Sequence, residues 1–146
     1  MSLPEFEPSG DLPLGIHRAT LREVLSRFGT GSLQRIVVGE RLDRIYQMAR
    51  VAGHVRRFIA FGSFVTDEPG PNDVDVFLVM DDAFEADAVS GEARLLFDHA
   101  AADAHLGASV FWVRRLAAFG GEENAVQFWQ VKRGGGKRGI VEIVEE

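Results

Sequence analysis

The sequence predicts a single α+β domain in which helices pack against a mixed β-sheet. Its 146 residues are 46% hydrophobic and 26% charged, an ordinary composition for a globular domain of this size. Segments with helical spacing of apolar residues and short apolar runs typical of strands follow one another in the order helices, strand, strand, helix, strand, helix, strand. Residues 1–18, punctuated by proline and glycine, are predicted to be irregular, and residues 19–146 to form the domain.

Apolar residues at helical spacing predict two helices before the first strand. The first covers residues 19–28, and Gly29 would end it. The second begins after a plausible N-cap at Ser32, continues to about Ala52, and would be ended by Gly53. Its apolar positions fall on one broad stripe, as expected of a helix packed on a sheet.

Two apolar runs, within the stretch FIAFGSFVTDEPGPNDVDVFLVM at residues 58–80, predict neighbouring strands. Residues 57–61 have the pattern of a short, largely buried strand. Residues 66–72 contain two prolines and a glycine, which indicates a loop. Residues 74–80 are apolar on both faces, so this second strand is expected near the centre of the sheet.

The second half of the chain predicts a helix capped by Ser90 and ended by Gly107, then a strand, a weaker helix and a last strand. These four elements are expected at residues 90–106, 109–113, 122–130 and 139–144. The intervening segment RGGGKRG, residues 133–139, is expected to be flexible.

Composition excludes several classes of protein. The chain has no cysteine, so it forms no disulfide and no thiolate metal site. Acids and prolines stand near the N-terminus where a signal peptide needs a basic start, and no apolar run approaches the roughly 18 residues of a membrane span. A cytoplasmic protein without a membrane partner is therefore expected. The net charge of −6 argues against extended nucleic-acid binding.

Asp73 and Asp75 are the most informative residues. Because side chains two apart in a strand point to one face, their carboxylates are expected side by side, and a divalent cation would relieve their repulsion. Gly62 and Ser63 end the preceding strand, where backbone amides and a hydroxyl are able to donate to phosphate oxygens. The alternative interpretation, ordinary turn chemistry at residues 72–73, accounts for Asp73 but leaves Asp75 within an apolar strand.

Residues 61–77, with a hydrophobic residue followed by Gly-Ser, nine residues, and Asp-x-Asp in an apolar strand, resemble the DNA polymerase β-like nucleotidyltransferase superfamily. The likeness is closest to its small bacterial members, the minimal nucleotidyltransferases. The opening LPLGIHRATLREVLSRFG, together with GSFVT, also resembles a group of short uncharacterised bacterial proteins usually placed in that superfamily. The resemblance implies a nucleotidyltransferase-like mixed sheet flanked by helices.

The resemblance also implies a Mg²⁺-dependent transfer of a nucleoside monophosphate from an NTP to a protein hydroxyl, an RNA end or a small molecule. Gly62 and Ser63 would hold the β and γ phosphates. Asp73 and Asp75 would be the catalytic metal ligands for two Mg²⁺ ions, one activating the acceptor oxygen and the other neutralising the departing pyrophosphate.

Basic residues near this signature are candidates for further contacts with the triphosphate. Arg57 is counted with the predicted nucleotide-binding residues, but spacing does not select between it, Arg56 and the C-terminal basic run at residues 132–138. Solvated strand ends and a mobile loop are the plainer interpretation of the same clusters.

In one respect the sequence departs from the superfamily, whose members normally carry a third carboxylate on a later strand. The strand expected at residues 109–113 has none, and Asp81, Asp82 and Glu142 lie elsewhere. The alternative is therefore a catalytically weak or inactive binding protein with this fold, such as an antitoxin-like partner of a toxin. A partner protein or a homodimer mate would then complete the cleft.

Two other features are interpreted as structural. His99 and Asp103 lie one helical turn apart and are expected to form a surface pair. Trp112 and Trp129 are expected in the core, because phenylalanine is abundant around them.

Overall fold

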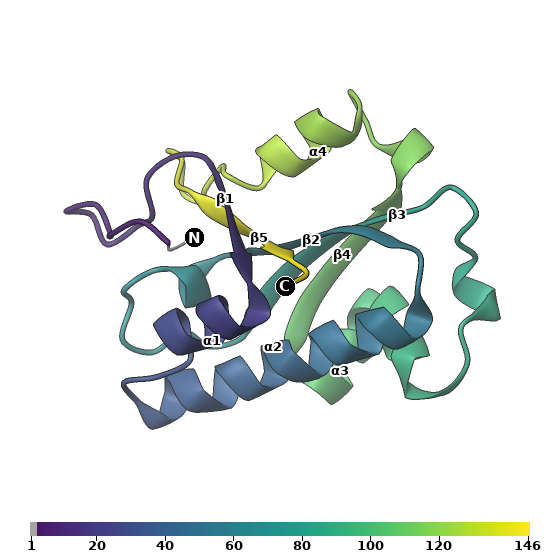
Figure 1. The fold of residues 1–146 in the computed structure, drawn as a ribbon, viewed down its shortest axis with the longest axis horizontal. Helices are drawn as coiled ribbons and strands as arrows, with labels where there is room; N and C mark the ends of the chain where they lie inside the picture. Colours follow the sequence, from purple (N-terminus) through teal and green to yellow (C-terminus); the bar gives the residue numbers. More distant parts are fainter. Residues whose placement is uncertain (1–2) are drawn as a thin grey trace.

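The computed structural model describes residues 3–146, which form a five-stranded sheet with strand order β1-β5-β2-β3-β4 (Figure 1). The pairs β1–β5 and β3–β4 are parallel, whereas β5–β2 and β2–β3 are antiparallel. The predicted α+β class with a mixed sheet is confirmed. The strands are β1 (Ile16–Thr20), β2 (Val55–Phe61), β3 (Val74–Met80), β4 (Ala108–Arg114) and β5 (Ile140–Val144).

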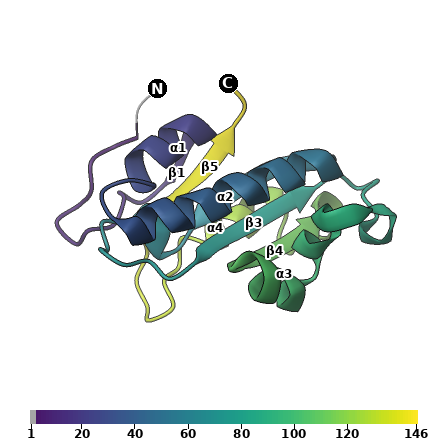
Figure 2. The same cartoon turned by 90° about the horizontal axis from the view of Figure 1, so that it is seen from below.

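Helices cover both faces of this sheet. The α-helices are α1 (Leu21–Phe28), α2 (Leu33–Ala52), α3 (His99–Leu106) and α4 (Glu122–Phe128). In Figures 1 and 2, α4 lies on the opposite side of the sheet from α1, α2 and α3. We call the side of the sheet toward α4 the α4 face. No helix in residues 3–146 combines the length and the apolarity required to cross a membrane.

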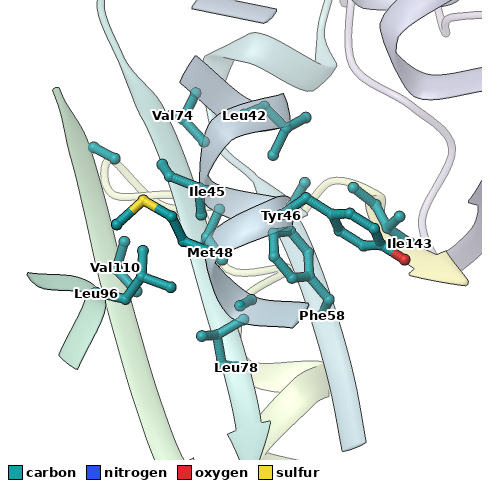
Figure 3. Close-up of a cluster of buried hydrophobic side chains, with 14 of the residues drawn as sticks. Leu42, Ile45, Tyr46, Met48, Phe58, Val74, Leu78, Leu96, Val110 and Ile143 are labelled. Carbon is teal, nitrogen blue, oxygen red and sulfur yellow. The ribbon is translucent and has the colours of Figure 1, made fainter. Parts of the chain in front are cut away.

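The larger core lies between the sheet and α2. Alternate β3 residues, from Val74 to Met80, point toward α2 and are fully buried. They meet Leu42, Ile45 and Met48 of that helix (Figure 3). Each such fully buried side chain stabilises the fold by roughly 1.5–3 kcal/mol relative to an exposed one. This packing fixes β3, the strand that contains Asp75.

The remaining β3 residues belong to the α4 face. Phe77 and Val79 join Ile59, Val126 and Ile140 in a second, smaller apolar cluster. Because β3 is buried on both faces, its predicted central place in the sheet is confirmed. The two tryptophans also pack as predicted, Trp112 against the larger core and Trp129 against the smaller cluster.

The long helix α2 begins and ends where the sequence predicts. The Ser32 hydroxyl accepts a hydrogen bond from the Arg35 amide at 3.1 Å, and Gly53 ends the helix with φ of 72°. The prediction of a first helix at residues 19–28 is two residues too long. Thr20 is the N-cap of α1, in a reciprocal capping box with Glu23.

Strand β1 was not predicted. Residues 3–15 are free of helix and strand, and residues 1–2 of the predicted irregular segment lie outside the described residues, but residues 16–18 belong to β1. The strand pairs with β5, where Ile16 is opposite Ile140. Its partner is thus more than 120 residues away in sequence, and only Ala19 in it is buried. No local pattern of apolar residues predicts such a strand.

The prediction of one continuous helix at residues 90–106 is wrong. The structure has a 3₁₀ helix at Gly91–Phe97 and then α3, whose N-cap Asp98 accepts from the Ala101 amide at 3.0 Å. Ser90 makes no side-chain capping hydrogen bond. The internal aspartate therefore starts a new helix.

The other predicted elements are confirmed with end shifts of one or two residues. They are the strands expected at residues 57–61, 109–113 and 139–144 and the helix expected at residues 122–130. The glycine-rich segment at residues 133–139 forms most of a small hairpin that is closed by a bridge between Val131 and Lys137. We call residues 131–137 the basic hairpin.

Candidate functional site

The Gly62-Ser63 turn and Asp75 meet at one end of the β2–β3 pair. In the antiparallel register Phe61 is opposite Asp75, and Gly62 follows with φ of 83° and ψ of −165°. This backbone conformation is essentially restricted to glycine. A Cβ atom on Gly62 would overlap the Asp75 carboxylate, with the Asp75 Cγ only 2.9 Å away. The carboxylate therefore lies directly against the Gly62 backbone.

Backbone and buried side-chain contacts fix the turn after Gly62. A 3₁₀ helix, Ser63–Val65, follows it, and the Thr66 hydroxyl donates to the Ser63 carbonyl at 2.7 Å. The buried Arg35 guanidinium donates to four backbone carbonyls, which belong to Phe28, Phe64, Thr66 and Glu68. Arg35 thus ties α1, α2 and the turn together. Sequence reasoning missed this residue because its acceptors are backbone atoms with no sequence signature.

Asp73 lies immediately before β3 and Asp75 is the second residue of that strand, so the two predicted site residues lie at the same end of the sheet. Burial raises the pKa of Asp75 to about 6, and the negative charge of Asp73 contributes to this rise. Burial also raises the pKa of Asp73, and the charge of Asp103 on α3 adds to it. Each carboxylate is therefore partly desolvated beside another negative charge, an arrangement that a bound cation would stabilise.

Ser109 lies on the other side of Asp75. In the parallel β3–β4 register it is directly opposite Asp75, and its side chain favours the ionised carboxylate. Sequence reasoning missed both Ser109 and Asp103. Ser109 reaches the site through the pairing of β3 with β4, and Asp103 through the packing of α3 beside β4. Neither the strand pairing nor the helix packing leaves a signal in the local sequence.

Three arginines act electrostatically on Asp73 or Asp75. The charge of Arg133, in the basic hairpin, lowers the pKa of both Asp73 and Asp75. Arg41 of α2 lowers the pKa of Asp73, and Arg138 lowers that of Asp75. The structure thus brings part of the predicted C-terminal basic run to the site.

The structure does not bring Arg57 to the Gly62-Ser63 turn. Arg57 lies four residues before Phe61 in β2, which is about 13 Å along an extended strand. Its guanidinium binds both carboxylate oxygens of Glu142, at 2.9 and 3.2 Å, and one oxygen of Glu123 at 2.8 Å. Burial acts to lower the pKa of Arg57, but these hydrogen bonds outweigh it and raise the pKa. Arg57 therefore joins β2 to β5 and α4.

The further carboxylates considered from the sequence are engaged elsewhere. Asp81 lies 3.7 Å from Arg56, and Asp82 lies 2.8 Å from Arg115. Glu142 is bound by Arg57, as described above. Within residues 3–146, no group of three or more histidine, aspartate or glutamate side chains is arranged to hold a metal ion. The described chain supplies two adjacent carboxylates, so other ligands would have to come from a substrate and water.

His99 and Asp103 do not form the surface pair that their spacing predicts. His99 stacks on Phe111 with ring centroids 4.9 Å apart, and its Nδ1 lies 3.4 Å from the Val110 carbonyl. Asp103 instead acts electrostatically on Asp73. The two residues therefore have separate surroundings although they lie one helical turn apart.

Beyond Asp75, the α4 face is aromatic. Trp129 packs on Phe61, Phe77 and Phe111, with ring centroids 4.5, 5.2 and 5.0 Å away. Trp129 and Phe77 also line an open groove of about 610 Å³ between α4 and the sheet. Phe119 at its rim is 97% exposed. A large apolar surface thus lies next to the carboxylate pair.

One protein family matches nearly the whole chain. The sequence profile of DUF6932, a family of unknown function, matches residues 4–144. The chain belongs to the DUF6932 family. No curated protein and no solved structure matches it. The chemistry of this DUF6932 protein must therefore be argued from the geometry of the site.

Replacing Gly62 of the DUF6932 protein by alanine should lower its free energy of unfolding by about 2 kcal/mol, because the new methyl group meets the Asp75 carboxylate and the backbone is strained. Urea denaturation measures this change. Gly134→Ala is the matched control, since a Cβ there meets no atom within 4 Å, and it should change stability by less than about 0.5 kcal/mol. Equal effects of the two substitutions would contradict the close approach of Asp75 to Gly62.

Proposed function

We propose that this DUF6932 protein is a Mg²⁺-dependent nucleotidyltransferase that transfers a nucleoside monophosphate from an NTP to an acceptor hydroxyl. One observation carries the proposal. Two partly desolvated carboxylates, Asp73 and Asp75, lie at the start of β3, and one of them rests against the Gly62 backbone. Nothing in the apolar packing of β3 requires a buried acid at position 75.

The two carboxylates suit magnesium. Burial and mutual repulsion disfavour their ionised forms in the unliganded protein, and a divalent cation reverses that preference. Mg²⁺ in proteins is commonly held by one or two carboxylates together with substrate phosphates and water. The missing side chain at Gly62 lets the Asp75 carboxylate lie against the backbone of the turn. Asp73 and Asp75 would therefore hold the metal.

The remaining residues would bind and orient the substrate. Ser63, at the start of its 3₁₀ helix, offers a hydroxyl and a backbone amide to the β and γ phosphates. The acceptor oxygen would form a bond to the α-phosphorus while the bond to the bridging oxygen breaks, so that pyrophosphate leaves and the hydroxyl proton passes to water. Magnesium, when bound, supplies charge stabilisation to this displacement. An NTP-dependent reaction of this kind belongs in the cytoplasm.

A second candidate function is favoured by the groove beside α4. Its lining is almost entirely apolar, and Phe119 and Phe128 at its edges are 97% and 61% exposed. Exposed apolar surface of this kind often marks an interface with a partner or a second copy. Together with the absence of a carboxylate on the α4 face of β4, where Ser109, Phe111 and Val113 point, it favours a binding protein such as an antitoxin-like partner of a toxin.

Calorimetric titration of ATP, GTP, CTP and UTP into the protein, with and without Mg²⁺, tests the first function. We expect Mg²⁺-dependent binding of at least one NTP, and its loss in the double variant Asp73→Asn/Asp75→Asn. Asp87→Asn is the matched control, because the Asp87 side chain is 96% exposed and pairs with Arg94, away from Asp73 and Asp75. Transfer of label from an NTP labelled at the α-phosphate, but not at the γ-phosphate, would identify nucleotidyl transfer.

Two results would contradict this function. One is the absence of Mg²⁺-dependent binding in the wild-type protein, and the other is unchanged binding in the double variant. A stoichiometric protein partner that co-purifies, combined with no transfer of label, would favour the binding-protein function instead.

A further inference from the structure

Most arginines of this protein are neutralised by a carboxylate. Within residues 3–146, the arginines that form such ion pairs are Arg22, Arg44, Arg50, Arg56, Arg57, Arg94, Arg114, Arg115 and Arg138. Five arginines form none with the described residues, namely Arg18, Arg27, Arg35, Arg41 and Arg133. Of these, Arg41 and Arg133 act electrostatically on Asp73. Two unneutralised guanidinium groups beside two carboxylates require an explanation.

Arg41 is held in place by backbone. Its Nη1 donates to the carbonyl of Asn72, the residue before Asp73, at 3.2 Å. A Cβ on Gly107 would lie 3.0 Å from the Arg41 Cζ, so the guanidinium fits closely against the start of β4. One carbonyl uses only one of the five N–H donors of a guanidinium. The others are available for an acceptor near Asp73.

Arg133 is presented by the basic hairpin. The Lys132 amide donates to the Gly136 carbonyl at 2.9 Å, and the Gly135 amide to the Lys132 carbonyl at 3.1 Å, which forms the turn. Asp11 anchors the base of the hairpin through Lys132 at 3.0 Å. The Arg133 side chain is exposed, so its guanidinium group is open to a ligand.

The carboxylates and the guanidinium groups influence one another without touching. Within residues 3–146, neither Asp73 nor Asp75 has an ion-pair partner within 4 Å. Arg41 nevertheless reaches the residue before Asp73, through its hydrogen bond to the Asn72 carbonyl at 3.2 Å, and the charge of Arg133 acts on both carboxylates. A ligand that fits between these groups must offer a positive pole to the carboxylates and negative oxygens to the guanidinium groups. A magnesium polyphosphate has both.

We propose that Arg41 and Arg133 bind non-bridging oxygens of the substrate polyphosphate whose metal ion is held by Asp73 and Asp75. This inference rests on the proposed function and assigns to it two residues from separate elements, α2 and the basic hairpin. A planar guanidinium donates two parallel hydrogen bonds to phosphate, a geometry that lysine does not offer. Arg57, bound to Glu142 and Glu123, has no part in this contact.

The test uses inorganic tripolyphosphate with MgCl₂, a probe that lacks base and sugar. Calorimetric titration should show that Arg41→Gln and Arg133→Gln each weaken binding about tenfold, and that the double variant weakens it about a hundredfold. Lys137→Gln is the matched control. This substitution removes one positive charge from the same hairpin, but Lys137 lines a separate cavity with Leu14 and Phe128. The affinity of the Lys137→Gln variant for tripolyphosphate should therefore stay within about twofold of the wild-type value. Circular dichroism melting establishes that each variant is folded.

The outcomes separate this inference from the function on which it rests. If Asp73→Asn abolishes Mg²⁺-dependent binding of tripolyphosphate while both arginine variants bind like wild type, the arginine assignment is overturned and the proposed function stands. Equal weakening by Lys137→Gln would show a general charge effect and also overturn the assignment. If the wild-type protein binds no tripolyphosphate with Mg²⁺, both proposals fall.

Discussion

Replacing Arg35 by methionine is expected to lower the free energy of unfolding by about 3 kcal/mol. The buried guanidinium donates to four carbonyls in α1, in the turn after Gly62 and in the following loop. Methionine fills similar space but donates nothing, so these buried carbonyls lose their charged partner. Urea denaturation should show this loss, and the melting temperature should fall by roughly 6–12 °C.

Arg50→Met is the matched control for this substitution. Arg50 lies on the same helix, is exposed, and pairs with Glu145 at 2.8 Å. A surface pair of this kind contributes little, and we expect a change below about 0.5 kcal/mol. A loss of less than about 1 kcal/mol for Arg35→Met would show that the four hydrogen bonds do not hold the turn.

Replacing Asp75 by asparagine is expected to remove Mg²⁺ binding and, unusually for a buried site residue, to stabilise the metal-free protein. Burial raises the pKa of Asp75 to about 6, from about 3.9 in an unfolded chain. The folded state therefore binds the proton more tightly, and ionised Asp75 destabilises the fold above about pH 6. This cost disappears as the pH falls from about 6 to about 4. The difference corresponds to about 1–2 kcal/mol after allowance for solvent screening.

Urea denaturation in EDTA at pH 4.5 and at pH 8 measures this effect. Relative to wild type, Asp75→Asn should gain about 1–2 kcal/mol at pH 8 and much less at pH 4.5. Added Mg²⁺ should stabilise the wild-type protein at pH 8 and leave the variant unchanged. Asp87→Asn, at an exposed position, should behave like wild type in every condition. A variant that is less stable than wild type at pH 8, or that still responds to Mg²⁺, would contradict the assigned role of Asp75.

The parts of the fold that the sequence predicts well are those with strong local signals. Strand β3 is apolar at every position except Asp75 and follows a loop rich in proline and glycine, and α2 has both a serine N-cap and a terminating glycine. Strand β1 has only Ala19 buried and depends on a distant partner. The break between the 3₁₀ helix and α3 depends on Asp98 acting as an N-cap, whereas the sequence predicts the cap at Ser90.

The site residues also differ in whether a local sequence signal predicts them. Gly62 and Asp75 were predicted together because they flank one loop, and the β2–β3 register places them in contact. Ser109 and Arg133 come from elements about 35 and 60 residues later, whose placement follows from the sheet rather than from spacing. Arg57 has the charge expected of a phosphate ligand, but spacing alone does not select it over the other basic residues. Its carboxylate partners on β5 and α4 could not be read from the sequence.

The parallel pairing of β1 with β5 has a consequence for how this protein forms. Ile16 is opposite Ile140, so during synthesis on the ribosome β1 has no partner until β5 has emerged. A contact of such high sequence separation raises the contact order and slows folding. Residues 16–20 should accordingly be among the last to gain protection in a pulse-labelled hydrogen-exchange experiment, well after the β2–β3 hairpin.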